Sequence, residues 1–188
     1  MKKADIKPKR ILFAHSAGSQ DGSGEGSFDL VSTLKTELSD EYNIQYPIID
    51  DPDAPTYQAW KKLDSVFEKN MEPLILIGHS LGGSVLLKYL SEEEVDISIA
   101  GLFLISIPLW GTEGWNVDEF VLPDNFEAKL GLSSNVYLYH SRGDETVPFE
   151  HLNFYKNAFP YATVRELEGK DHAFAGGLPE LISDIKSI

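Results

Sequence analysis

The chain has 188 residues, of which 42% are hydrophobic and 24% are charged, and its formal net charge is −14. These values are typical of a globular protein, so we expect residues 1–188 to form a single folded domain. Cysteine is absent, which excludes a disulfide framework, a thiolate nucleophile and cysteine-ligated metal clusters. The negative charge disfavours nucleic acid and anionic lipid as partners and favours neutral or cationic substrates.

The first ten residues are basic, but the apolar run that follows them, 11–14, is too short for a signal peptide. We expect the basic side chains of this segment to be solvated. The longest mostly apolar segment, 97–110, contains polar residues and is too short to cross a bilayer. We therefore expect a cytoplasmic protein with no membrane partner.

Apolar runs alternate with amphipathic stretches along the whole chain. In chain order, the pattern predicts a strand at 10–15, a helix at 27–38, a strand at 43–49, a helix at 56–69, a strand at 74–78, a helix at 81–90, strands at 97–107 and 135–140, a helix at 148–159, a strand at 163–167 and a helix at 178–188. Such alternation predicts an α/β fold, a three-layer sandwich with a mostly or wholly parallel sheet of about six strands and helices on both faces. The continuous apolar strands agree, because parallel strands are buried on both sides.

Two segments are predicted to be loops. Residues 16–27 are rich in glycine and serine, but they lack the lysine of a P-loop, and Ser27 occupies the last glycine position of G-x-G-x-x-G. We therefore expect no nucleotide cofactor there. Residues 109–134 contain Trp110, Trp115 and Phe120, which either line an apolar substrate pocket as part of a partial lid or cover the core.

The segment Gly78-His79-Ser80-Leu81-Gly82 matches the pattern G-x-S-x-G. It follows an apolar strand and opens an apolar-periodic helix, which is the context that a nucleophile elbow requires. A serine on such a tight turn projects its hydroxyl above the sheet, and only glycine fits easily two residues before it and two residues after it. We predict that Ser80 is a nucleophile and that the amide of Leu81 points toward a developing oxyanion.

Residues 74–83, Leu-Ile-Leu-Ile-Gly-His-Ser-Leu-Gly-Gly, resemble the elbow of α/β hydrolases, and the resemblance covers nearly the entire chain. More narrowly, the chain resembles the small, capless members of the retinoblastoma-binding-protein type. Asp-Pro-Asp-Ala-Pro at 51–55 and Trp60 are the residues that support this narrower resemblance. The superfamily implies a fold that carries a catalytic serine, an acid and a histidine in that chain order.

His172 lies between the last predicted strand and the last predicted helix, where the superfamily has its catalytic base. Asp144, in Gly143-Asp144-Glu145-Thr146-Val147-Pro148, matches the acid that orients the base. Glu145 is the alternative acid, and Asp171 is interpreted as a loop former. Three of the other histidines are expected to be structural or exposed: His79, His140 and His151. His15 ends the first predicted strand and is expected to face the same edge of the sheet as the site.

By resemblance, the amide of Ala17 is the second oxyanion donor. The loop departs from the usual His-Gly pair, because Ser16 follows His15, and we expect both residues near the pocket. The resemblance implies a carboxylesterase-like serine hydrolase that cleaves an ester, thioester or amide through an acyl-enzyme, with no cofactor and no metal. Three alternatives remain: a catalytically weak binding or scaffold protein with a protein partner, a small peptidase, and a perhydrolase.

Overall fold

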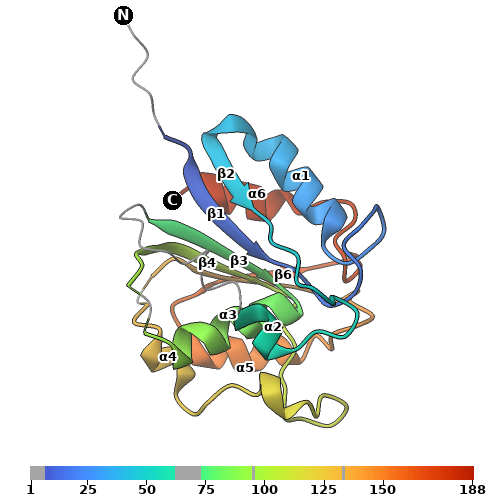
Figure 1. The fold of residues 1–188 in the computed structure, drawn as a ribbon, viewed down its shortest axis with the longest axis vertical. Helices are drawn as coiled ribbons and strands as arrows, with labels where there is room; N and C mark the ends of the chain where they lie inside the picture. Colours follow the sequence, from blue (N-terminus) through green and yellow to red (C-terminus); the bar gives the residue numbers. More distant parts are fainter. Residues whose placement is uncertain (1–6, 62–72, 95, 133) are drawn as a thin grey trace, which may run out of the picture.

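The computed structural model describes residues 7–61, 73–94, 96–132 and 134–188. Within these ranges one sheet contains six strands: β1 (Lys9–Ala14), β2 (Tyr42–Gln45), β3 (Leu74–His79), β4 (Ile99–Ile105), β5 (Val136–Ser141) and β6 (Thr163–Leu167). Their order is β2-β1-β3-β4-β5-β6, and every neighbouring pair is parallel. The strands labelled in Figure 1 accordingly run toward one edge of the sheet. The predicted fold class is confirmed.

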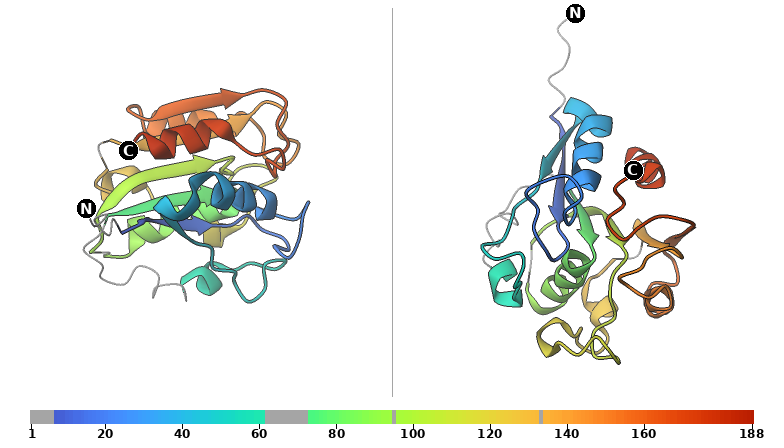
Figure 2. Two further views of the ribbon diagram at one scale, coloured as in Figure 1. Left: turned by 90° about the horizontal axis from the view of Figure 1, so that it is seen from above. Right: turned by 90° about the vertical axis from the view of Figure 1, so that its right-hand side faces the viewer.

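Helices cover both faces of this sheet. They are α1 (Phe28–Leu38), α2 (Tyr57–Lys61), α3 (Leu81–Glu92), α4 (Phe126–Lys129), α5 (His151–Ala158) and α6 (Pro179–Lys186), with short 3-10 helices η1 (Ser39–Glu41) and η3 (Asp118–Phe120). Helices α1 and α6 pack on one face, and α3 lies on the other face with α2, α4 and α5 around it (Figures 1 and 2). No helix in the described part of the chain is long and apolar enough to cross a membrane.

Strand β3 shows how the sequence builds a core on each face. Leu74 and Leu76 are buried with the side chains of α3, whereas Ile75 and Ile77 are buried with those of α1 and α6. Successive side chains of a strand point to opposite faces, so a continuous apolar strand supplies both cores. The sheet is consequently covered by apolar side chains on both of its faces.

Some element boundaries differ from those predicted. Strand β2 ends at Gln45 rather than Ile49, and the next residue but one is Pro47, which has no N–H to continue a ladder. Helix α5 begins at His151 rather than Pro148, which lies in the preceding turn. The part of the predicted helix 56–69 beyond Lys61 falls outside the described residues. The predicted loop 109–134 contains η3 and α4.

The loops that follow the strands gather at the carboxyl edge of the sheet, to which the arrows point (Figure 2, left). Strand β3 differs from the others because α3 begins two residues after it ends, with only Ser80 between them. In open parallel sheets this edge is where ligands bind. Ser80 and the loops around it therefore lie where a ligand is expected to bind.

Candidate active site

Ser80 occupies the turn between β3 and α3, with φ 52° and ψ −123°. This conformation is strained for a residue other than glycine, and such strain is characteristic of functional turns. The glycines two residues before and two residues after Ser80 are required by close packing. A Cβ atom on Gly78 would overlap the backbone of Gly83, and one on Gly82 would overlap the carbonyl group of Ala14. The turn thus has the tight strand–turn–helix geometry expected of a nucleophile elbow.

A hydrogen-bonded histidine–carboxylate pair lies at the same edge. His172 Nδ1 is 3.0 and 2.9 Å from the two carboxylate oxygens of Asp144, so its N–H donates to the carboxylate. Because Nδ1 carries the proton, Nε2 of the neutral ring is able to accept one. The two residues meet because Asp144 follows β5 and His172 follows β6, and these strands are neighbours in the sheet.

The carboxylate of Asp144 is fully buried and held by several donors. The backbone amides of Thr146 and Val147 donate to its Oδ1, at 2.9 and 2.8 Å. Burial on its own raises the pKa of Asp144, but the hydrogen bond and charge of His172, together with the Val147 amide, outweigh burial and hold that pKa well below its usual value. Asp144 is therefore ionised at neutral pH and fixes the orientation of the His172 ring.

Ser80 and His172 line one cavity of about 580 Å³ at the carboxyl edge. Ser80 is only 8% exposed, so its access to solvent is restricted to this side. The predicted oxyanion residues, Ala17 and Leu81, line the same cavity. Leu81 is the first residue of α3, and the first amides of a helix have no acceptor within it, so they form a favourable site for a negative charge.

Of the residues predicted to form the pocket, Ser16, Trp110, Trp115 and Phe120 line this cavity. The indole N–H of Trp110 donates to Ser84 Oγ at 2.9 Å, which fixes the ring against α3. Trp115 and Phe120 each contact Trp110, with ring centroids 5.2 and 5.1 Å apart. The aromatic residues of the 109–134 segment therefore form one wall of the cavity.

The prediction that His15 faces the pocket is wrong. Its ring is fully buried, does not line the cavity and packs against Trp60 at 4.6 Å between centroids. Nδ1–H donates to the carbonyl of Ser16 at 2.6 Å, and Nε2 accepts the amide N–H of Ile49 at 3.4 Å. These contacts hold His15 behind the cavity wall, where it supports the loop that carries Ala17.

The sequence interpretation overlooked a role for His79. It is fully buried and accepts a hydrogen bond at Nδ1 from Ser27 Oγ, 2.8 Å away, while Nε2–H donates to the backbone carbonyl of His172, also at 2.8 Å. Ser27 Oγ in turn accepts the amide N–H of Ser16 at 2.9 Å. This series of hydrogen bonds connects the loop of His172 with the loop of Ala17 through His79, a residue of the elbow itself. The one available signal was a polar residue at a position that the elbow directs into the protein.

The alternative acids have other contacts. Glu145 lines the cavity but is not the partner of His172, and Asp171 accepts the amide N–H of Ala175 at 3.1 Å, as expected for a loop former. Within the described ranges, no three histidine or acidic side chains are grouped so that they could hold a metal ion.

Comparison with known proteins places this geometry in a family. The family model for serine hydrolases matches residues 31–173, which is most of the chain and includes Ser80, Asp144 and His172. No curated protein sequence matches the chain significantly.

Solved structures reproduce the fold at low sequence identity. The ydeN gene product of Bacillus subtilis superimposes with a TM-score of 0.78 at 21% identity, covering 95% of this chain and 97% of that one. XC6422 from Xanthomonas campestris, described as an α/β serine hydrolase without a lid, gives 0.66 at 15% identity and covers 100% and 83%. A structure from work on carboxylesterases of Nitrososphaera gargenis gives 0.70 at 14% identity and covers 98% and 91%. These likenesses establish the fold.

Proposed function

Because the chain belongs to the serine hydrolase family, we propose that it hydrolyses an ester, thioester or amide bond of a small substrate through a Ser80–His172–Asp144 triad. The observation that carries the proposal is the cavity that Ser80 and His172 both line. His172 Nδ1–H donates a hydrogen bond to the buried, ionised carboxylate of Asp144, which leaves Nε2 free of a proton. A serine hydroxyl needs such an oriented base, because it is a poor nucleophile near neutral pH.

In the proposed reaction, His172 Nε2 removes the Ser80 proton as Oγ attacks the substrate carbonyl. The carbonyl oxygen becomes an oxyanion that the amides of Leu81 and Ala17 stabilise. The C–O, C–S or C–N bond to the leaving group then breaks, and His172 donates its proton to that group. Water attacks the acyl-enzyme with the same base, which releases the acid and restores Ser80.

The test is labelling with a fluorophosphonate probe, which modifies an activated serine. We expect the wild-type protein to be labelled at Ser80, and Ser80→Ala to lose labelling and, on the order of a millionfold, ester hydrolysis. His172→Ala should lose activity on a comparable scale because triad members act as a unit. Labelling that persists in Ser80→Ala would disprove the nucleophile assignment.

The same experiment addresses the scaffold alternative, since a folded wild-type protein that resists the probe has no activated serine. A pure binding role gives no reason for a buried carboxylate to orient a histidine that lines the same cavity as Ser80. Carboxylesterase specificity is part of the proposal, and comparing p-nitrophenyl esters with matched anilides separates it from peptidase activity.

The narrower kinship with the retinoblastoma-binding-protein type is also a proposal. It is supported by the motif at 51–55, whose Pro52 carbonyl accepts the amide N–H of Gly18 at 2.7 Å, and by Trp60 against His15. Pro52 and Trp60 thus support the loop that carries Ala17, which links the motif to the candidate active site.

A further inference from the structure

The net charge of the chain is concentrated around the candidate active site. Five loops follow strands β1, β2, β4, β5 and β6 at the carboxyl edge; they span 15–27, 46–56, 106–125, 142–150 and 168–178. Together they contain fourteen of the 30 acidic residues but only two of the 16 basic ones. Most of the net charge of −14 therefore lies at one edge of the sheet, and the rest of the chain is nearly balanced.

The two basic side chains in these loops are already engaged. Arg142 pairs with Glu166 and Glu168 at 2.7 and 3.3 Å, and Lys170 Nζ donates to the carbonyl of Gly177 at 3.1 Å. They do not line the cavity that contains Ser80. Among the described residues, the basic side chains of these five loops are therefore paired away from the cavity.

The wall of the cavity is acidic as well. Two carboxylates, Glu119 and Glu145, line it, and its described lining contains no lysine or arginine. Glu119 is held in place because its Oε2 accepts the amide N–H of Tyr57 at 2.9 Å. Trp110 and Trp115 present aromatic surface to the same space, and the face of an aromatic ring attracts cations.

The negative potential acts on the cavity in which Ser80 is proposed to meet its substrate. Ser80 is more than nine-tenths buried and lines this cavity. A cleft with low-dielectric walls focuses the field of surrounding charges, which raises the local concentration of oppositely charged substrates and excludes those of like charge. The reaction also creates a negative oxyanion, and a positive charge on the substrate offsets the cost of forming it beside carboxylates.

We propose that this hydrolase selects substrates that carry an ammonium or similar cationic group, placed between Glu119, Glu145 and the tryptophans, and discriminates against substrates that carry a carboxylate. This inference rests on the proposed function, because it assigns a substrate class to the same cavity.

Three p-nitrophenyl esters of equal acyl length test it: one ending in a trimethylammonium group, one in the isosteric tert-butyl group and one in a carboxylate. At low ionic strength we expect kcat/KM for the cationic ester to exceed that of the neutral isostere by about tenfold, and the anionic ester to be the poorest. Added salt should compress these ratios, since it screens the exposed carboxylates.

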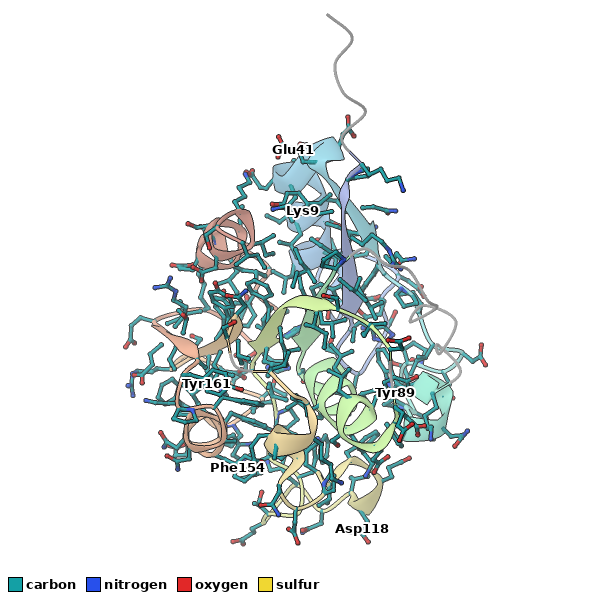
Figure 3. All side chains as sticks on the ribbon, turned by 90° about the vertical axis from the view of Figure 1, so that its left-hand side faces the viewer. Lys9, Glu41, Tyr89, Asp118, Phe154 and Tyr161 are labelled. Atoms are coloured by element: carbon teal, nitrogen blue, oxygen red, sulfur yellow. The ribbon has the colours of Figure 1, made fainter. Side chains whose placement is uncertain are left out.

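The double variant Glu119→Gln, Glu145→Gln should reduce the ratio of the cationic to the neutral ester. The matched control is Glu37→Gln, Glu41→Gln, which removes the same charge at the opposite edge of the sheet and should leave the ratio unchanged. Figure 3 shows Glu41 at one end of the molecule and Asp118, beside Glu119 in the chain, at the other.

The outcomes separate the two proposals. A protein that resists the fluorophosphonate probe and hydrolyses none of the esters refutes the proposed function. A protein that hydrolyses the neutral ester, but the cationic one no faster, refutes only the charge selection, and so does a ratio that the Glu119, Glu145 variant leaves unchanged. If the probe labels Ser80 but the esters are not turned over, labelling rates of a cationic and a neutral phosphonate give the same comparison, and equal rates refute the inference.

Discussion

His79 Nε2 lies 2.8 Å from the backbone carbonyl oxygen of His172 and donates a hydrogen bond to it. Burial, aided by the nearby His172 ring, lowers the pKa of His79 to about 3, so the His79 ring is neutral at physiological pH. A neutral ring that donates from Nε2 must accept at Nδ1, which matches the position of the Ser27 hydroxyl. The tautomer is therefore fixed, and His79 positions the predicted base through its main chain.

The variant His79→Phe should lower kcat by about a hundredfold with little change in KM, because misplacing a catalytic group by about 1 Å has an effect of this size. His79→Gln keeps an N–H donor and should recover part of the loss. Ser27→Ala, which breaks the next link, should cause a smaller loss in the same direction. A folded His79→Phe protein with wild-type kcat would show that the contact has no positioning role.

Buried neutral histidines make stability depend on pH. Burial lowers the pKa of His15, His79 and His140 below the usual value, whereas in the unfolded chain each accepts a proton near its ordinary pKa. As the pH falls below about 6.5, the unfolded state therefore binds protons that the folded state does not. The free energy of unfolding should fall by up to about 1.4 kcal/mol per pH unit for each such histidine.

Urea unfolding measured between about pH 7 and pH 5 checks this expectation. The variant His140→Gln should show a shallower dependence, smaller by about one histidine, because one buried acceptor of protons is gone. If wild-type stability were constant across this range, the three rings would have to titrate equally in the folded and unfolded states.

The placement of the candidate triad could be predicted from sequence because it depends mainly on topology. Ser80 and Asp144 each follow a buried, mostly apolar strand, His172 follows the more polar strand β6, and parallel strands bring their carboxyl ends to one edge. Strands β3 and β5 are recognisable by their apolar runs, whereas β6 is indicated by its place between two helical patterns. What those three residues do chemically remains a prediction that the labelling experiment tests.

The buried contacts behind the site could not be predicted in this way. His79 meets Ser27 and His172, which are 52 and 93 residues away in the chain, and such pairings depend on how the loops pack rather than on local pattern. The same reason applies to His15: a strand end favours the pocket, but Trp60, from a separate element, packs against the His15 ring and helps to hold it behind the cavity wall. The sequence pattern thus predicts which edge of the sheet a polar residue at a strand end occupies. It does not predict whether that side chain lines the cavity or lies behind the cavity wall.

Gly82 is a test of the close packing at the elbow. Because a Cβ at this position would overlap the carbonyl groups of Ala14 and His15, we expect Gly82→Ala to destabilise the protein by about 3 kcal/mol. The matched control is Gly176→Ala, where a Cβ meets nothing within 4 Å. Thermal unfolding of both variants measures the difference, and equal stability would mean that the approach of α3 to β1 is looser than described.

Trp110 lines two cavities at once: the one that contains Ser80 and a second of about 470 Å³ that Phe126 and Phe154 also line. Replacing its indole with a methyl group should connect them and extend the space available to an acyl chain. We therefore expect Trp110→Ala to raise kcat/KM for a p-nitrophenyl ester of a long acyl chain relative to a short one by about tenfold, since each buried methylene contributes about 0.8 kcal/mol.

Trp115→Ala is the control for this change. Trp115 belongs to the wall of the first cavity but not to that of the second, so its removal widens the site without connecting the two spaces. Its chain-length preference should shift much less than that of Trp110→Ala. Because the Trp110 indole N–H is held by Ser84, Ser84→Ala should release the ring and produce a weaker shift in the same direction. A folded Trp110→Ala enzyme with the wild-type chain-length profile would show that the second cavity stays closed to the substrate.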